Sequence, residues 1–320
     1  MQKGTLVVLL GNARGGELTW DSMKKHLLEP YDADLALAFG HTSELPASLT
    51  SQARYTWIMQ EPHDWGEIYD LCAQEHGIVN WRKKCLNAST TGLFGGVIMN
   101  GKRLSGSGAI IFGMRHWLVK TQLPILSTYE TVILTRSDHM YACDHPVVRP
   151  VLNEVCVVKG EDYDGITDRH HIFCGKDAKK AIDIVSFIVQ HLQPNSNSNP
   201  ERAVKSYFDH VGLHVTRFSR CMYTVARENE QSSWSVGRLD VGGGLWSKYP
   251  SEYNTSSEYC ASEPQPLMHC SKLGHFPSAI VIFFVTLVVV VILFVSGFVL
   301  MKNIPSQQNH RKEQGYSIHV

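Results

Sequence analysis

The sequence predicts an α/β domain built on a mostly parallel sheet with helices on both faces, followed by one C-terminal transmembrane helix. Short runs of leucine and β-branched residues alternate with segments of helical periodicity through residues 5–226, which is the pattern of a parallel sheet covered on both faces. The run from Ser278 to Met301 contains no charged residue. It exceeds the roughly 20 apolar residues that a helix needs to cross a bilayer.

Strands and helices are expected in alternation from the N-terminus. The expected strands, recognised as short buried runs, are Thr5–Leu10, Ala33–Phe39, Tyr55–Met59, Thr131–Thr135, Glu154–Val158, Val215–Phe218 and Met222–Ala226. The expected helices, recognised by apolar residues at helical spacing, are Trp20–Leu28, Trp65–Gln74, Ala109–Leu123, a segment from Ala178 to Leu192 behind Asp177, and Glu201–His210. Asn199 and Pro200 form a good N-cap and first turn for the last helix. The last two strands are expected to complete the sheet.

Four regions follow from these patterns. Residues 1–226 form the main domain. Residues 227–276 are polar, glycine-bearing and weakly periodic, and are expected to form a trailing cover and a juxtamembrane stalk. Residues 277–301 form the predicted transmembrane helix, and residues 302–320 a short polar tail. The protein is therefore expected at a membrane.

Two features disagree about the side of the membrane on which the domain lies. Lys302, Arg311 and Lys312 follow the apolar run, so the positive-inside rule places the tail in the cytoplasm and the domain on the other side. The N-terminal run Thr5–Leu10 is broken at once by Gly11 and is too short for a normal signal peptide, which favours a cytosolic domain. The side stays open, with an endomembrane or Golgi-like location expected in a eukaryote.

Charge and cysteine content narrow the classes of partner. The 30 Lys and Arg residues balance the 30 Asp and Glu residues, so no global field favours a nucleic-acid partner. The eight cysteines show none of the spacings of a zinc site. Cys260 and Cys270 lie in the polar stretch before the apolar run and could pair if that stretch is lumenal. Two N-glycosylation sequons begin at Asn87 and Asn254.

The first candidate site is the glycine-rich turn Gly11–Gly16, between a predicted strand and helix. At Gly11 and Gly15 the backbone can approach a phosphate closely, and the guanidinium of Arg14 can hold a diphosphate through two hydrogen bonds. The turn lacks the spacing of a P-loop or a dinucleotide fingerprint. A plain strand-to-helix turn is the alternative.

The second candidate site follows the predicted strand Thr131–Thr135. There the chain runs directly into Arg136 and Asp138, and ligands of open α/β sheets gather beyond the carboxyl ends of strands. A carboxylate such as Asp138 can hold Mg²⁺ or Mn²⁺ against a diphosphate. The alternative is a solvated Arg136–Asp138 ion pair without function.

The third candidate site is a glycine-bearing loop, residues 159–171, rich in charge. Crowding carboxylates into one loop is costly unless a cation or a reaction needs them, although Asp168 and Arg169 could equally form a loop-fixing ion pair. The adjacent His170 and His171 should point to opposite sides of an extended chain, so a histidine-bound zinc is not expected. The loop begins at Lys159, its acidic residues are Glu161, Asp162, Asp164 and Asp168, and Arg169 follows Asp168 directly.

Several short motifs together resemble a group of glycosyltransferase-like proteins that includes algal and viral members and, more distantly, WavE-type lipopolysaccharide-synthesis proteins. The resemblance spans roughly residues 5–226, and its motifs are Leu134-Thr-Arg-Ser-Asp-His-Met-Tyr141, Gly160-Glu-Asp-Tyr-Asp-Gly-Ile-Thr-Asp-Arg-His170, Asn199-Pro-Glu201 and Val215-Thr-Arg-Phe218. It implies a Rossmann-like GT-A-type mixed sheet flanked by helices, with residues 1–226 as the catalytic domain.

The resemblance also implies roles for the candidate residues. The family's metal-binding D-x-D motif matches Arg136-Ser-Asp138, so Asp138 would hold Mn²⁺ or Mg²⁺, while Arg136 stands at the first acidic position and puts metal dependence in doubt. Asp168 would be the catalytic base or an acceptor contact. The sugar or acceptor loop would comprise Glu161, Asp162, Asp164, Arg169 and His170.

These implications predict a membrane-anchored glycosyltransferase, a hexosyl- or pentosyltransferase that moves a sugar from a nucleotide-sugar donor to a glycan or glycoconjugate acceptor. One alternative is a non-catalytic, membrane-tethered binding protein with a transferase-like fold, which the Arg136 substitution favours. A second alternative, a Rossmann-type methyltransferase, needs an acidic residue soon after the second strand, where only Glu44 is available.

Overall fold

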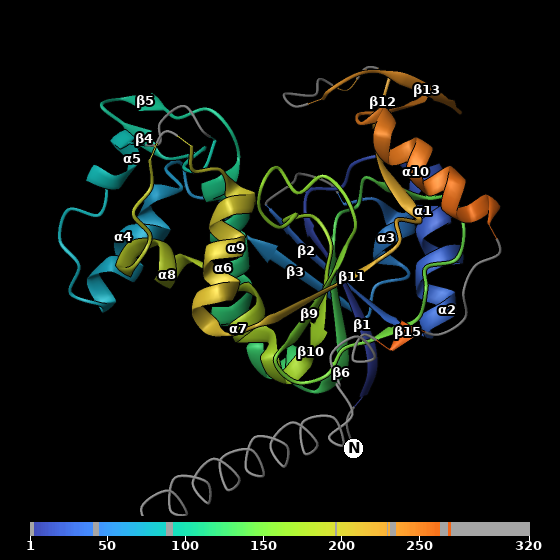
Figure 1. Cartoon of the computed structure of the whole chain (residues 1–320), viewed down its shortest axis with the longest axis horizontal. Coiled ribbons are helices and arrows are strands. Elements are labelled where there is room, and N and C mark those ends of the chain that lie inside the picture. Colours follow the sequence, from blue (N-terminus) through green and yellow to red (C-terminus); the bar gives the residue numbers. More distant parts are fainter. Residues whose placement is uncertain are drawn as a thin grey trace, which may run out of the picture. The chain divides into compact units, whose positions relative to one another are not determined.

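The core of the structure is a seven-stranded mixed sheet in the order β11-β9-β10-β6-β1-β2-β3, seen in the computed structural model of Figure 1. Six strands run parallel, and β10 alone runs antiparallel to both of its neighbours. The strands are β1 (Lys3–Gly11), β2 (Asp34–Gly40), β3 (Tyr55–Met59), β6 (Tyr129–Thr135), β9 (Glu154–Val158), β10 (His171–Cys174) and β11 (His214–Phe218).

Side chains alternate between two hydrophobic cores, one on each face of this sheet. In β1, Leu6 and Val8 enter the first core, whereas Val7 and Leu9 enter the second. All four are fully buried, as expected for a strand covered on both faces. The prediction of a sheet covered on both faces is therefore confirmed.

Helices on opposite faces of the sheet close the two cores, as the separation of α6 from α1 and α2 shows (Figure 1). The first core is covered by α4 (Gly66–Glu75), α6 (Gly108–Leu126), α7 (Ala178–Ile182), α8 (Val185–Gln190) and α9 (Pro200–Val211). The second is covered by α1 (Glu17–Met23), a π-helical turn (Lys24–Leu28), α2 (Glu29–Tyr31) and α3 (Ala47–Thr50).

The predicted helices and strands are confirmed with small changes in their bounds. The Asn199 side chain accepts a hydrogen bond from the backbone N–H of Arg202 at 2.7 Å, so the predicted N-cap of α9 is present. The helix predicted from Ala178 to Leu192 is interrupted at Asp183 and Ile184, which separate α7 from α8.

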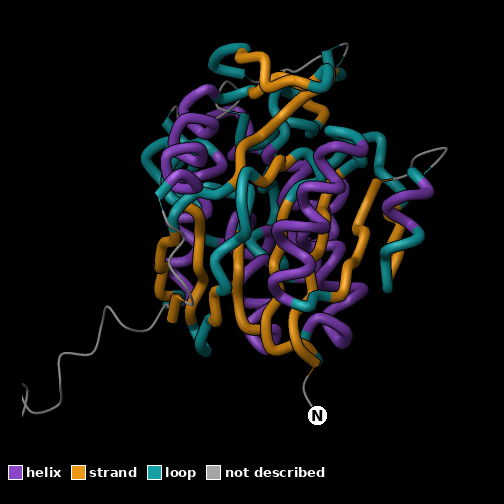
Figure 2. Tube along the Cα trace, turned by 90° about the vertical axis from the view of Figure 1, so that its right-hand side faces the viewer, coloured by secondary structure: helices purple, strands orange, loops and turns teal. Residues whose placement is uncertain are grey.

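One predicted strand belongs to a different sheet. Met222–Ala226, expected to complete the main sheet, forms β12 (Met222–Arg227) in a four-stranded sheet of order β13-β14-β12-β7. β12 pairs with β7 (His139–Tyr141) on one side and with β14 (Leu245–Ser247) on the other, and β14 pairs in turn with β13 (Leu239–Gly242). Both views place this second sheet at the end of the domain away from the start of β1 (Figures 1 and 2). The prediction also missed β10, because its short sequence lies beside the charged loop.

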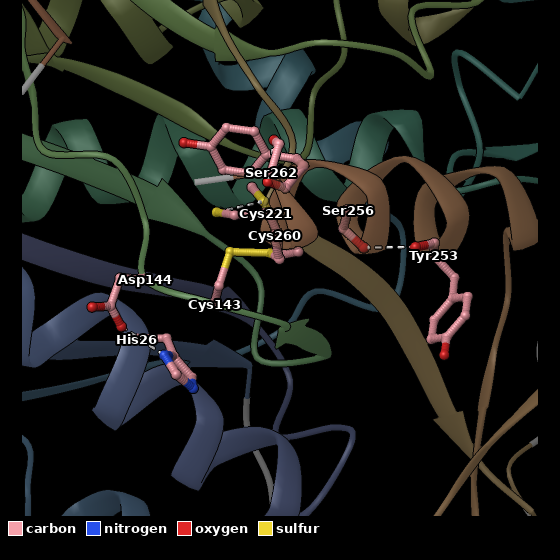
Figure 3. Close-up of a disulfide and its surroundings, with 10 residues drawn as sticks. His26, Cys143, Asp144, Cys221, Tyr253, Ser256, Cys260 and Ser262 are labelled. Atoms are coloured by element: carbon pink, nitrogen blue, oxygen red, sulfur yellow. Dashed lines mark hydrogen bonds and ion pairs between the residues drawn. A yellow bond between two sulfur atoms is a disulfide. The ribbon is translucent and has the colours of Figure 1, made fainter. Parts of the chain in front are cut away.

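Part of the segment expected to be a cover is regular structure. It contains β13, β14 and α10 (Pro250–Ala261), and a disulfide between Cys143 and Cys260 joins α10 to the chain after β7 (Figure 3). The pairing of Cys260 with Cys270, which the sequence left open, is excluded because Cys260 is bonded to Cys143. The remaining short elements are α5 (Lys83–Asn87) and the paired strands β4 (Ile98–Met99) with β5 (Lys102–Arg103) and β8 (Val148–Arg149) with β15 (Met268–His269).

The structure describes residues 3–40, 45–87, 92–195, 197–228, 230, 235–262 and 268–269. These belong to one compact unit, Met1–Cys270. The predicted transmembrane helix at 277–301 and the tail at 302–320 lie outside the described residues. Within those residues, no helix combines the length and apolar character needed to cross a membrane.

Candidate functional site

The charged candidate residues follow strands that end at one edge of the main sheet. Because β1, β2, β3, β6, β9 and β11 are parallel, their carboxyl ends share an edge, and the reversed strand β10 begins there. The two neighbours of β1 are β2 on one side and β6 on the other. The strand order therefore switches direction between β1 and β6, the position at which open α/β sheets bind ligands.

The loops that follow β1 and β6 are hydrogen-bonded to each other at this switch point. The Arg14 backbone N–H donates to Ser137 Oγ at 3.0 Å, and Ser137 Oγ donates to the Asn12 carbonyl at 2.6 Å. Gly11 and Gly15 adopt φ values of 122° and 82°, a region that favours glycine. The predicted turn is thus fixed against the predicted Arg136–Asp138 segment.

The Arg14 side chain leaves this junction towards solvent. It is 49% exposed, and its Nε lies 3.9 Å from a carboxylate oxygen of Glu230, a distance that makes only a weak ion pair. The guanidinium can therefore turn to an incoming anion at little cost.

Asp138 is held inside the domain by two cations. Arg136 donates from Nε to Oδ1 and from Nη2 to Oδ2, each at 2.7 Å, and Lys248 Nζ donates to Oδ2 at 3.1 Å. The residue is 1% exposed. Burial alone would raise its pKa, but the charges of Arg136 and Lys248 outweigh burial and hold the pKa well below the ordinary range.

The side chains at Asp138 do not fit a divalent cation. Both carboxylate oxygens already accept N–H groups from cations, and a metal ion would have to replace a guanidinium and an ammonium in a buried position. Across the residues that the structure describes, no group of three or more His, Cys, Asp or Glu side chains is placed to hold a metal ion. The chemistry at this position is that of a fixed guanidinium.

In the charged loop, three of the four acidic side chains have partners. Asp162 pairs with Arg217 at 2.9 Å, Asp164 pairs with Arg202 at 2.9 Å, and Glu161 accepts from Ser251 at 2.8 Å and from the Tyr163 hydroxyl. Asp162 also accepts from the Thr167 backbone N–H at 3.1 Å. These contacts shape the loop.

Asp168 is the acidic residue of this loop whose carboxylate is uncommitted. It is half-buried, and its side chain accepts no hydrogen bond from any described residue. Its backbone carbonyl accepts from the buried Arg115, and its charge acts on Arg115, Arg136 and Arg169. An unpaired carboxylate among guanidiniums can accept a proton from a bound hydroxyl.

Glu201, at the start of α9, is the neighbour of Asp168 that the sequence did not identify. Burial, and then the charge of Asp168, raise the pKa of Glu201 to about 7. Gly165 lets the loop approach this helix, since a Cβ there would lie 2.1 Å from the Glu201 carbonyl carbon. A carboxyl group with a raised pKa beside a second carboxyl group is typical of acid–base sites.

Arg169 is fixed by the segment that leads into α10. Its Nη1 lies 2.9 Å from Glu252 Oε1, an oxygen that also lies 3.1 Å from Arg220 Nη1, and its guanidinium stacks on the Tyr249 ring at 4.1 Å. Glu252 is 1% exposed. Burial alone would lower the pKa of Arg169, but the charge of Glu252 outweighs burial and raises the pKa above its ordinary value.

His170 lies beneath the loop rather than on its surface. It is fully buried, with Nδ1 2.9 Å from Thr135 Oγ1, and its ring stacks on His145 with centroids 5.2 Å apart. His171 points to the other face, towards Phe208, as the alternation of an extended chain predicts. Burial lowers the pKa of His145 to about 4 and of His171 to about 3, so these rings are neutral.

One cavity lies beside this region, and another lies in the opposite part of the domain. One of about 130 Å³ is lined by the loop at Lys159–Glu161, Arg220 and α10, beside the Arg169–Glu252 contact. Another of about 570 Å³ lies between α7, α8 and α9. Neither cavity is lined by Arg14, Asp138 or Asp168. Residues 41–44, which follow β2 at the same edge, lie outside the described residues.

Several residues of the site carry no local sequence signal. Arg115 sits in an apolar helix, and Lys248, Tyr249 and Glu252 come from the segment with weak periodicity. Glu201 was visible as part of the motif Asn199-Pro-Glu201, but only its capping context was apparent. No protein-family model matches the sequence, and no curated protein matches it.

Proposed function

We propose that this chain is a glycosyltransferase that moves a sugar from a nucleotide-sugar donor to a glycan or glycoconjugate acceptor, tethered to a membrane by its apolar segment. The observation that carries the proposal is the hydrogen-bonded contact between the loops of Arg14 and Arg136 at the switch point of the sheet, with the charge of Asp168 acting on Arg136. Support for a GT-A-type fold comes from the mixed sheet with helices on both faces.

The residues divide the reaction between charge stabilisation and proton transfer. As the bond between the sugar's anomeric carbon and the diphosphate breaks, the diphosphate leaves with the electron pair, and Arg14 and Arg136 stabilise its charge. The acceptor hydroxyl oxygen forms the new bond to that carbon. In an inverting transfer, the Asp168 carboxylate takes the hydroxyl proton. Asp138 orients Arg136 through two hydrogen bonds.

A panel of UDP- and GDP-sugars tests this function with the purified full chain, scored for nucleotide release with and without acceptor glycans. We expect acceptor-dependent release for one donor, and a loss of at least about 100-fold for Asp168→Asn, the scale of a positioned general base. Asp209→Asn is the matched control, because Asp209 is an exposed aspartate that pairs with Lys205 on α9, outside the candidate loop. Equal turnover in the two variants would refute the assignment of Asp168.

A non-catalytic binding protein is the second candidate function. The saturated Arg136–Asp138–Lys248 contact favours it, because no pair of free carboxylates remains where the family's metal motif stands. Binding of a nucleotide sugar without nucleotide release from any donor and acceptor pair would select this candidate.

A further inference from the structure

The Cys143–Cys260 disulfide bears on the side of the membrane. It joins residues 117 positions apart in sequence and fixes the end of α10 to the chain after β7 (Figure 3). Disulfides persist in oxidising compartments and are rare where glutathione keeps thiols reduced. Cys72, Cys85 and Cys221 are buried and form no disulfide, so this bond is a selective pairing.

The disulfide resolves the disagreement between the two sequence features. The cationic residues Lys302, Arg311 and Lys312 after the apolar run indicate a cytoplasmic tail, and a cytoplasmic tail places the domain on the opposite, oxidising side. The disulfide and the positive charges after the apolar run therefore both indicate that the domain lies on the non-cytoplasmic side.

The same helix carries an acceptor for N-glycosylation. Asn254-Thr255-Ser256 matches the sequon N-x-S, and Asn254 is exposed near the middle of α10. Its side-chain amide makes no hydrogen bond to any residue that the structure describes. A domain on the oxidising side of a eukaryotic secretory membrane is accessible to the enzyme that attaches glycans to such asparagine amides.

The helix geometry directs Asn254 away from the candidate site. Glu252 and Ser256, two positions to either side, are buried, and the Ser256 hydroxyl donates to the Tyr253 carbonyl at 3.0 Å (Figure 3). With 3.6 residues per turn, a position two residues away lies about 200° round the helix. A glycan on Asn254 therefore projects into solvent and leaves the Arg169–Glu252 contact intact.

We propose that the domain lies in an oxidising, lumenal or extracellular compartment and that Asn254 carries an N-linked glycan there. In this modification the amide nitrogen of Asn254 attacks the anomeric carbon of a lipid-diphosphate-linked oligosaccharide supplied by the secretory pathway. A C–N bond forms and the C–O bond to phosphate breaks. The lipid diphosphate leaves with the electron pair, and the amide proton passes to a base of the transferring enzyme. This inference is independent of the chain's own activity.

Expression of the full chain in eukaryotic cells, followed by digestion with an amidase that removes N-glycans, tests the modification. We expect a mobility shift on digestion that is absent in Asn254→Gln and present in Thr255→Ala, which alters only the unrestricted sequon position. Asn87→Gln is the comparison for the second sequon, Asn87-Ala-Ser89. An unshifted wild-type chain, or a shift that persists unchanged in Asn254→Gln, would overturn the proposal.

Thiol alkylation of the same preparation tests the compartment separately. In cells lysed with an alkylating reagent and no reductant, Cys143 and Cys260 should resist modification and become reactive only after reduction. Alkylation of both without reductant would show that the domain resides in a reducing compartment and would overturn the inference, whatever the chain transfers.

Discussion

The Arg136–Asp138 turn and the loop ending at Asp168 lie at the same edge of the sheet but hold their aspartates in opposite states. Asp138 is buried and accepts three hydrogen bonds from Arg136 and Lys248. Asp168 is half-buried, and its carboxylate accepts no hydrogen bond from the described residues. Asp138 therefore holds the surrounding side chains in place, whereas the Asp168 carboxylate is available for the proton transfer proposed above. Spacing in the sequence does not distinguish them.

The largest expected effect tests this difference through stability. Asp138→Asn leaves the partly exposed Arg136 and the buried Lys248 without their buried counter-charge, and removal of one partner of a buried ion pair costs about 3–5 kcal/mol. Asp168→Asn should change the free energy of unfolding by less than about 1 kcal/mol, because partly exposed charges contribute little. Urea denaturation of both variants measures the contrast. Equal losses would contradict the distinction.

A second prediction concerns the helix that fixes Arg169. Glu252→Gln removes the buried charge shared by Arg169 and Arg220, and we expect a loss of about 3 kcal/mol because the amide oxygen can still accept one hydrogen bond. Glu258→Gln, an exposed position on the same helix, is the control and should unfold like the wild type. A stable Glu252→Gln protein would mean that the Arg169 loop holds its shape without α10.

A third prediction follows from the neutral histidines that lie below both segments. Burial lowers the pKa of His145 to about 4 and of His171 to about 3, whereas histidines of the unfolded chain take up protons near pH 6.5. Between these values the unfolded chain binds more protons, so stability falls as pH drops from 6.5 towards 4. Each ring contributes up to about 1.4 kcal/mol per pH unit.

Urea midpoints at pH 7.5, 6.0 and 5.0 measure this dependence. The exposed His76 offers a control, since His76→Gln should leave the slope unchanged. A midpoint that stays constant from pH 7.5 to 5.0 would show that these rings are protonated inside the domain.

A smaller effect is expected at Glu201, the neighbour of Asp168, because one partly exposed group titrates there instead of two buried rings. Because burial and then Asp168 raise the pKa of Glu201 to about 7 from an ordinary value near 4.5, the folded chain binds more protons between these values. This group therefore costs stability as pH rises from 4.5 through 7. The free energy of unfolding of Glu201→Gln, relative to that of the wild type, should therefore be higher at pH 8 than at pH 4. A difference that is independent of pH would place Glu201 in ordinary solvent.

Most elements of the fold were predictable because their signals are local. Leu6–Leu9 alternate between two cores within four consecutive residues, and Asn199 with Pro200 specifies the start of α9 within one turn. The loops that follow β1 and β6 could likewise be located from the ends of their strands. The reversed direction of β10 could not be predicted, since its four residues do not reveal the direction in which they pair.

The sequence by itself determined where most strands and helices of the main sheet form, which loops lie at the carboxyl ends of those strands, and which charged residues those loops carry. Only the tertiary structure decided the partners: Lys248 for Asp138 across 110 positions, and Cys143 for Cys260 across 117. Periodicity is a property of neighbouring residues, and backbone geometry converts it directly into local structure. The state of a carboxylate or thiol depends instead on side chains brought to it from distant positions, and on the water that they exclude.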